Sequence, residues 1–296
     1  MSEATAPLST VAEAPPWRRA RQSWGLREGD AISGGLTVLR RLGGGQRYEV
    51  FLVWDDHRLA VLVAKVLRPE HVGDPVSLRD LAAEAAALER LRHPAVVRAF
   101  DAVLDGPLPH LLLEHLEGPT LRELLDRDGP LPPEQLLPLA LHAAAALHYV
   151  AAEGMVHLDV KPDNIVMGAP PRLIDLSVAR TVEAAARLRS AVGTDAYMAP
   201  EQCDPARGTV GPPADVFGLA ATLFHACAGR RPFVRADGER FPQLARRPAV
   251  LPGAFGSLLS DALSAAPGDR PTAREFAVAL EPLVAGLPRS RWARDA

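Results

Sequence analysis

The sequence predicts an α+β fold divided into two lobes, a small one built mainly of β-strands and a larger one built mainly of helices. Short apolar runs of strand type dominate up to about residue 113, and longer apolar stretches at helical spacing dominate beyond about residue 119. We find no internal repeat, and 296 residues are enough to bury a substantial core. Clefts between lobes are common ligand sites, so we expect a site near residues 114–118.

The small lobe is expected to contain an antiparallel sheet and one helix. The strands are predicted at residues 36–42, 50–54, 59–67, 96–104 and 110–113. Three glycines, Gly43–Gly45, separate the first two strands. Residues 77–92 carry leucine and alanine at helical spacing, and His93-Pro94 ends that helix because the residue before a proline avoids the helical region.

Helices are predicted throughout the larger lobe. Pro132-Pro133 can open one of them, because proline is tolerated in the first helical turn. It leads into Leu136–Ala152, a stretch of 17 residues without a charge. A membrane span needs about 20 mainly apolar residues, and this stretch includes a proline and two histidines, so a buried helix is the better interpretation. Asp215–Ala228 predicts another helix, and Thr272-Ala-Arg-Glu275 has the spacing of a capping box.

Composition and charge exclude several classes of protein. The net charge of −3 gives no basic field for nucleic acid. Cys203 and Cys227 form neither a disulfide framework nor a zinc cluster, and they are expected to be reduced thiols. The N-terminus lacks the basic region and apolar core of a signal peptide. We therefore expect a cytoplasmic protein with no membrane span and no nucleic-acid partner.

The N-terminal segment is rich in alanine, proline and arginine, and we expect it to be a flexible tail. Trp17 and Trp24 flank three arginines within it, which would suit a docking segment, but a disordered tail is the favoured interpretation. The predicted division of the chain is a tail 1–28, a small lobe 29–113, a junction 114–118, a large lobe 119–286 and a short tail 287–296.

The strongest functional signal is a set of short motifs in the large lobe. His157-Leu-Asp159-Val-Lys161-Pro-Asp-Asn164 is followed by Leu173-Ile-Asp175 and then by Ala199-Pro200-Glu201. In this order they resemble the protein kinases of eukaryotic type, and the bacterial (Hanks-type) serine/threonine branch in particular. The resemblance covers about residues 30–286. It implies the bilobal kinase fold, ATP with Mg²⁺ or Mn²⁺ as cofactors, and protein substrates.

The resemblance also implies roles for the polar residues of these motifs. Asp159 would orient the substrate hydroxyl and accept its proton, and Lys161 would place a compact cation beside the γ-phosphate. Asn164 and Asp175 would supply oxygen ligands to Mg²⁺, a hard ion that prefers such ligands. Alone, each aspartate or asparagine is more commonly a turn or capping residue. Asp159, Asn164 and Asp175, in register with Lys161, favour the functional interpretation.

The chain contains only two lysines, Lys65 and Lys161, beside 31 arginines. Coding bias explains the scarcity of lysine. Both lysines nevertheless fall at positions that contact phosphates in the resembled family. A lysine offers an ammonium group on a flexible stem, which an arginine does not. In that family the first lysine pairs with a helix glutamate. Glu84 matches this position, whereas Glu89 is expected on the solvated face of the helix. The catalytic set implied by the resemblance is Asp159, Lys161, Lys65 and Glu84.

A nucleotide site is implied at the predicted sheet and at the junction. Leu42-Gly43-Gly-Gly45-Gln-Arg-Tyr48-Glu-Val50 resembles the loop that covers ATP phosphates, with Tyr48 in place of the third glycine. The carbonyl of Glu114 and the amide of Leu116 are implied to meet the adenine edge. The residues implied to bind the nucleotide are Leu42, Gly43, Gly45, Val50, Val63, Lys65, Leu113, Glu114 and Leu116.

Several other positions support the family pattern or depart from it. Glu201 and Arg270 are implied to form an ion pair, and Asp215 is implied to hold the loop that carries Asp159. Leu158 replaces the arginine that would pair with a phosphorylated residue, so we expect only weak activation by phosphorylation. The sequence leaves open whether Thr181, Ser190 or Thr194 is modified. Leu176-Ser177 stands where the family has phenylalanine and glycine, which is expected to restrict this segment.

Three functions therefore remain in competition. The first is a serine/threonine protein kinase that phosphorylates unidentified proteins and itself, with self-association for reaction between copies. The second is a catalytically impaired pseudokinase that acts as a nucleotide-binding scaffold, which the departures at Tyr48, Leu158 and Leu176-Ser177 favour. The third is a small-molecule kinase, against which the Ala199-Pro200-Glu201 motif speaks. Because charge positioning dominates phosphoryl transfer, the intact set of charged residues favours the first function.

Overall fold

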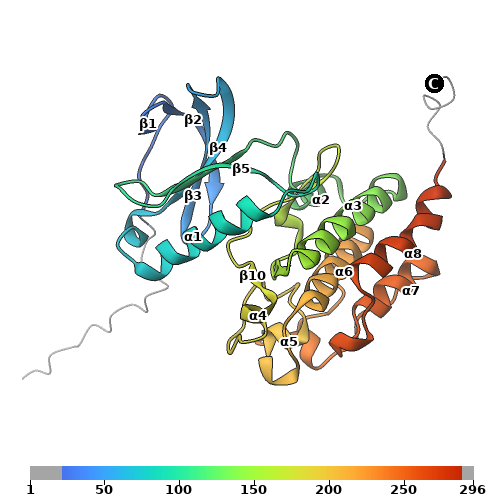
Figure 1. The fold of residues 1–296 in the computed structure, drawn as a ribbon. Coiled ribbons are helices and arrows are strands. Elements are labelled where there is room, and N and C mark those ends of the chain that lie inside the picture. The colour runs from blue at the N-terminus through green and yellow to red at the C-terminus, as the bar shows by residue number, and fades with distance from the viewer. Residues whose placement is uncertain (1–21, 289–296) are drawn as a thin grey trace, which may run out of the picture.

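The computed structural model describes residues 22–288 and shows two lobes (Figure 1). The N-terminal part, coloured blue to cyan, holds a sheet and one long helix, and the remainder is mainly helical. The elements of the small lobe are β1 (Ala31–Ser33), β2 (Leu36–Gly44), β3 (Tyr48–Asp55), β4 (Ala60–Leu67), α1 (Pro75–Arg90), β5 (Ala99–Val103) and β6 (His110–Glu114). The predicted α+β fold in two lobes is confirmed.

The strands form one antiparallel sheet in the order β1-β2-β3-β4-β6-β5. Its two faces pack against different parts of the molecule because side chains alternate along a strand. One face buries Val38, Phe51 and Val53 in a cluster of its own. The other face carries Tyr48 and Lys65 toward α1, and its apolar residues pack with those of the helix.

Helix α1 begins two residues before its predicted start and ends two residues before its predicted end. Asp74 caps it, since its side chain accepts hydrogen bonds from the amides of Val76 and Ser77, and Pro75 is tolerated in the first turn. Leu81 and Leu88 are buried in the cluster below the sheet. The helix thus holds a buried face against the sheet.

The large lobe is built around long apolar helices. Its helices are α2 (Leu121–Asp128), α3 (Pro133–Ala152), α4 (Val182–Ala185), α5 (Pro200–Cys203), α6 (Pro212–Ala228), α7 (Gly253–Ala262) and α8 (Ala273–Ala285). Short strands lie between them: β7 (Met155–Val156), β8 (Ile165–Val166), β9 (Arg172–Leu173) and β10 (Arg180–Thr181). The predicted capping box is present, because the Thr272 hydroxyl accepts from the Glu275 amide and the Glu275 carboxylate accepts from the Thr272 amide.

Helix α3 is the stretch that the sequence predicts as a buried helix. It packs against α6 and α8, and Leu139, Ala144 and Leu147 on it are almost completely buried. Within residues 22–288 it is the one helix long and apolar enough to cross a bilayer, and half of its most apolar window is covered by other parts of the chain. This packing is that of a helix inside a protein core.

Residues 22–28 differ from the predicted flexible tail, because they pack against the small lobe. The indole nitrogen of Trp24 donates to the Leu67 carbonyl at 2.8 Å, and Trp24 and Leu26 cover the outer face of the sheet. The sequence analysis missed this packing because the composition of a segment indicates how polar it is and cannot show which contacts a single tryptophan ring makes. Trp17 and the rest of residues 1–21, like residues 289–296, lie outside the described residues.

Candidate active site

One face of the sheet collects the residues expected to bind a nucleotide. Strand pairing places Val50 beside Lys65 and Val63 beside Leu113. Leu113 is buried, and Val63 is packed against the same cluster. These residues therefore share a face that turns toward α1 and the large lobe.

The ammonium group of Lys65 lies between two carboxylate side chains. Its Nζ is 2.7 and 2.9 Å from the two carboxylate oxygens of Glu84 and 2.7 Å from Oδ1 of Asp175. Burial disfavours the ammonium, but the two carboxylates outweigh this effect and raise the pKa of Lys65. The same ammonium outweighs the effect of burial on Asp175 and holds its pKa well below the usual range. Glu89 is exposed on the same helix as Glu84.

The glycine-rich hairpin between β2 and β3 is closed tightly. Gly44 has a φ of 147°, and a Cβ there would lie 2.4 Å from the carbonyl oxygen of Tyr48. Gly43 pairs with Val50 across the hairpin, and the Gly45 carbonyl accepts a hydrogen bond from Nε of Arg68 at 3.0 Å. Leu42, also expected near the nucleotide, is 39% exposed and so lies at the rim.

Tyr48 fills the space below this hairpin. Its ring centroid is 4.6 Å from Nζ of Lys65, and its hydroxyl is buried without a hydrogen-bond partner among the described residues. Burial raises the pKa of Tyr48 to about 12. The sequence predicts that Tyr48 hinders close approach of the hairpin to phosphates. The structure adds that it packs in the apolar cluster against α1.

Asp80, one turn before Glu84 on α1, joins two other segments to the helix. Its carboxylate contacts Arg47 of the glycine-rich hairpin and lies 3.7 Å from Nη2 of Arg180 on β10. Sequence reasoning missed this contact, since the three residues are far apart along the chain. Helix α1 is therefore tied both to the hairpin and to the segment that follows Asp175.

The loop that carries Asp159 is held from below by Asp215 on α6. Its two carboxylate oxygens accept hydrogen bonds from the amides of His157 and Leu158, both at 2.7 Å. Leu158 adopts a φ of 66°, which is unusual for a bulky residue, and its carbonyl accepts from Nε2 of Gln202 at 2.8 Å. These three bonds fix a backbone conformation that Leu158 disfavours, so the loop is rigid where the chemistry is expected.

The two carboxylate oxygens of Asp159 differ in their hydrogen bonds. Oδ2 accepts from Nζ of Lys161 at 2.7 Å and from Nδ2 of Asn164 at 3.1 Å. Oδ1 is buried and has no hydrogen-bond partner among the described residues. Lys161 also donates to the Thr194 hydroxyl at 2.8 Å. Lys161 and Asn164 therefore hold the Asp159 carboxylate in one orientation within the loop.

Asn164 and Asp175 lie at the same end of the β8–β9 hairpin, where the Ile174 amide donates to the Asn164 carbonyl at 2.9 Å. Asp175 carries an ionised carboxylate, and the Asn164 side chain offers an amide oxygen. Carboxylate and amide oxygens are the donors that Mg²⁺ prefers. The two residues therefore fit a divalent cation at this end of the hairpin, beside Asp159.

The junction at residues 114–118 begins at the last residue of β6. Its first residue, Glu114, forms an ion pair of 3.3 Å with Arg172 of the large lobe. Leu116 is partly buried against the cluster that includes Leu113. The backbone groups implied to meet an adenine thus lie at the edge of the apolar face described above.

Glu201 and Arg270 form the expected ion pair in the large lobe. The guanidinium of Arg270 donates to both Glu201 oxygens, at 2.7 and 2.8 Å, and also to three backbone carbonyls. Beside this pair, Cys203 is buried and accepts from Nε2 of Gln243 at 3.1 Å. Burial raises the pKa of the Cys203 thiol to about 12.

The comparison with protein families identifies the fold. The sequence profile of the protein kinase domain matches residues 36–279. The chain belongs to this family. The kinase fold explains why the residues of these motifs gather between a sheet with one helix and a helical lobe, as described above.

The curated relatives of this kinase-family chain include three bacterial serine/threonine kinases. It is 33% identical over 203 residues to the serine/threonine-protein kinase PknB of Mycobacterium leprae, covering 65% of this chain and 32% of that protein. It is 35% identical over 223 residues to the probable serine/threonine-protein kinase PkwA of Thermomonospora curvata, covering 74% and 30%. For the serine/threonine-protein kinase PkaA of Streptomyces coelicolor the values are 32% over 235 residues, 75% and 43%. The chain spans less than half the length of these relatives.

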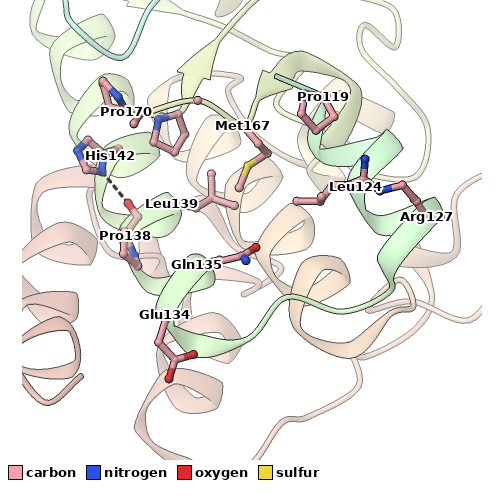
Figure 2. Close-up of a pocket in the computed structure, with 13 residues that line it drawn as sticks. Pro119, Leu124, Arg127, Glu134, Gln135, Pro138, Leu139, His142, Met167 and Pro170 are labelled. Atoms are coloured by element: carbon pink, nitrogen blue, oxygen red, sulfur yellow. Dashed lines mark hydrogen bonds between the residues drawn. The ribbon is translucent and has the colours of Figure 1, made fainter. Parts of the chain in front are cut away.

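A separate pocket of about 680 Å³ lies in the large lobe, between α2, α3 and the turn that joins β8 to β9 (Figure 2). Leu124, Leu139 and Met167 give it an apolar wall, and His142 is turned back onto the Pro138 carbonyl at 2.8 Å. None of the site residues predicted from the sequence lines this pocket. It is distinct from the face that carries Lys65.

Proposed function

We propose that this kinase-family chain is a serine/threonine protein kinase, which transfers the γ-phosphate of ATP to serine or threonine hydroxyls of proteins, including its own. The observation that carries the proposal is the carboxylate of Asp159, which Lys161 and Asn164 orient on a loop fixed by Asp215. A substrate hydroxyl placed beside this carboxylate gives Asp159 a proton to accept while Lys161 holds one of its oxygens.

The remaining charges suit the binding and orientation of phosphates. Lys65, paired with Glu84, presents an ammonium to the α- and β-phosphates, and Lys161 presents one to the γ-phosphate. Asn164 and Asp175 would hold Mg²⁺ or Mn²⁺, and this ion compensates phosphate charge when bound. Lys65 contacts Asp175 directly, so nucleotide binding must loosen this bond before phosphates reach the ammonium.

The preference for serine and threonine is supported by the contact between Lys161 and Thr194 and by the names of the relatives. The contact ties the Asp159 loop to the segment before Ala199, which in the family forms the platform for peptides. We further propose the lobes 29–113 and 119–286 joined by 114–118, and a cytoplasmic location. The protein substrates, and the self-association that phosphorylation between copies requires, belong to the same proposal.

The test is transfer of label from ATP in the presence of Mg²⁺, with Asp159→Asn beside the unaltered chain. We expect label on the chain or on an added protein, and a loss of roughly 100-fold or more in the variant. Absence of label in both would contradict the kinase function. A Mg²⁺-dependent thermal shift with ATP in that case would instead support the scaffold function of a pseudokinase.

A further inference from the structure

A buried carboxylate on the outer face of the sheet connects the N-terminal segment to the glycine-rich hairpin. Glu49, next to Tyr48 on β3, is completely buried. Its Oε1 accepts from the Ser23 hydroxyl at 2.8 Å, and its Oε2 accepts from the Trp24 amide at 2.9 Å. The segment Gln22–Trp24, which we call the N-terminal strap, therefore supplies two of the donors that this buried charge needs.

Arg68 completes the connection. It is 3% exposed, and its Nη1 lies 3.7 Å from Oε1 of Glu49. The same nitrogen donates to the Gln22 carbonyl at 2.8 Å, while Nε donates to the Gly45 carbonyl at 3.0 Å. One rigid guanidinium thus bonds the strap on one side and the tip of the hairpin on the other.

We propose that Ser23 and Trp24 are positioning residues for the glycine-rich hairpin, acting through Glu49 and Arg68. The inference rests on the proposed function, because it assigns the hairpin to the ATP phosphates. With the strap in place, Arg68 is oriented by Glu49 and Gln22, and it holds the carbonyl of Gly45. When the strap is released, Glu49 loses the Ser23 and Trp24 donors and, among the described residues, keeps only its ion pairs with Arg41, at 3.3 Å, and Arg68, so it attracts Arg68 away from Gly45.

The hairpin is also held by its own strand pairing and by the contact of Arg47 with Asp80, and the bond from Arg68 adds to these at Gly45. Glycines give its backbone a wide choice of dihedral angles, and ordering them upon nucleotide binding costs conformational entropy. A strap that fixes Gly45 in advance lowers this cost and so increases the affinity for ATP. The strap packs on the outer face of the sheet, and its hydrogen bonds among the described residues go to the small lobe, so we expect the transfer step at Asp159 to be unchanged.

Two variants of the full chain probe the strap. Trp24→Phe keeps an aromatic ring on the sheet but removes the indole bond to Leu67, and Ser23→Asp places a second carboxylate against Glu49. Glu28→Gln, at an exposed residue just beyond the strap, is the matched control. We expect KM for ATP to rise about three- to tenfold in Ser23→Asp and less in Trp24→Phe, with kcat changed less than about twofold.

A rescue distinguishes the charge effect from general damage. In the double variant Ser23→Asp with Glu49→Gln the two carboxylates no longer face each other, so KM is expected to fall below that of Ser23→Asp alone. A double variant with the same or higher KM would overturn the path through Glu49. Equal losses in kcat and kcat/KM across the strap variants would overturn the positioning role.

Hydrogen exchange keeps this inference separate from the proposed function. Amides of residues 44–48 are expected to exchange faster in Ser23→Asp than in the unaltered chain, while those of α3 remain unchanged. This result supports the coupling even if no label transfer is found, in which case only the kinase function fails. Unchanged exchange at 44–48, together with unchanged KM, would overturn the coupling while the kinase function stands.

Discussion

Nζ of Lys65 lies 2.7 Å from Oδ1 of Asp175, although the two residues are 110 positions apart and belong to different lobes. The same nitrogen contacts Glu84 of α1, so one ammonium joins the sheet, the helix and the large lobe. This contact joins the two lobes, together with the ion pairs of Asp80 with Arg180 and of Glu114 with Arg172. Phosphates and a cation that enter between Lys65 and Asp175 would replace a contact that the chain already makes.

The shape of the two lysines is expected to matter as well as their charge. Lys65→Arg and Lys161→Arg keep the positive charge but replace a compact ammonium with a planar fork, which misplaces it by about 1 Å or more. We predict that each variant loses roughly 100-fold of phosphoryl transfer. Label transfer at saturating ATP measures this. If both variants keep near-normal rates, the two lysines are merely survivors of coding bias.

The phenol of Tyr48 predicts a loss of stability in alkali. Burial raises its pKa to about 12, so the folded chain holds this proton more tightly than the unfolded chain, whose tyrosines ionise near pH 10. The stabilisation is therefore complete below about pH 10 and is lost as the pH rises toward 12, by up to about 3 kcal/mol. Tyr48→Phe should unfold in urea with a weaker pH dependence in this window. At pH 7 it should be at least as stable as the unaltered chain, because it removes the desolvation cost of a buried hydroxyl that has no partner among the described residues.

Leu158 predicts weak control by phosphorylation. It is buried and offers no cation to a phosphorylated residue of the segment after Asp175, while Ser190 and Thr181 on that segment are exposed. Phosphatase-treated enzyme and Ser190→Ala are each expected to keep activity within about threefold of the untreated enzyme, since an exposed ion pair contributes about 1 kcal/mol or less. A large loss in both preparations would show that phosphorylation is the switch after all.

The contacts of Asp80 predict that α1 is linked to the segment after Asp175 without phosphorylation of that segment. In Asp80→Asn the contacts to Arg47 and Arg180 lose their charge, and α1 is held less firmly against the hairpin. We expect kcat/KM for ATP to fall about three- to tenfold. Glu89→Gln, on the exposed face of the same helix, is the control and should behave as the unaltered chain. Equal activity of the two variants would remove Asp80 from the site.

Arg270 predicts a large effect on stability. Its guanidinium serves both oxygens of Glu201 and three carbonyls, and a lysine has neither the geometry nor enough donors in that plane. Arg270→Lys should lower the free energy of unfolding by about 3 kcal/mol, close to the cost of breaking a buried ion pair. Urea unfolding measures this, and Arg274→Lys, at an exposed position, is the matched control. A loss below about 1 kcal/mol would mean that the pair is replaceable.

The sequence predicts best those parts of the site whose residues lie close together along the chain. Asp159, Lys161 and Asn164 contact one another within one loop, so a motif of eight residues describes their geometry. The capping box at Thr272 is equally local. Likewise, the alternation of β3 and β4 is enough to place Val63 and Lys65 on one face.

Contacts between distant segments could not be predicted in this way. The family pattern draws attention to Gly43 and Gly45, yet Gly44 is the glycine whose Cβ would collide with the Tyr48 carbonyl. The bonds from Arg68 to Gly45 and Gln22 depend on how three strands and a terminal segment meet, which no periodicity reports. The composition of residues 22–28 even suggested a flexible tail. Contacts between distant segments depend on how side chains pack in the assembled sheet, which the local sequence does not show.

The buried thiol of Cys203 gives the molecule an internal reporter. Alkylating reagents attack thiolates, and a thiol with a pKa of about 12 is almost entirely protonated and also covered at neutral pH. Cys227, the other cysteine of the chain, is partly exposed on α6. Mass spectrometry of a pulse-alkylated sample would separate the two labels. The rate of the slower labelling reaction, at Cys203, would report how often α5 and its surroundings open in the intact protein, with no engineered probe.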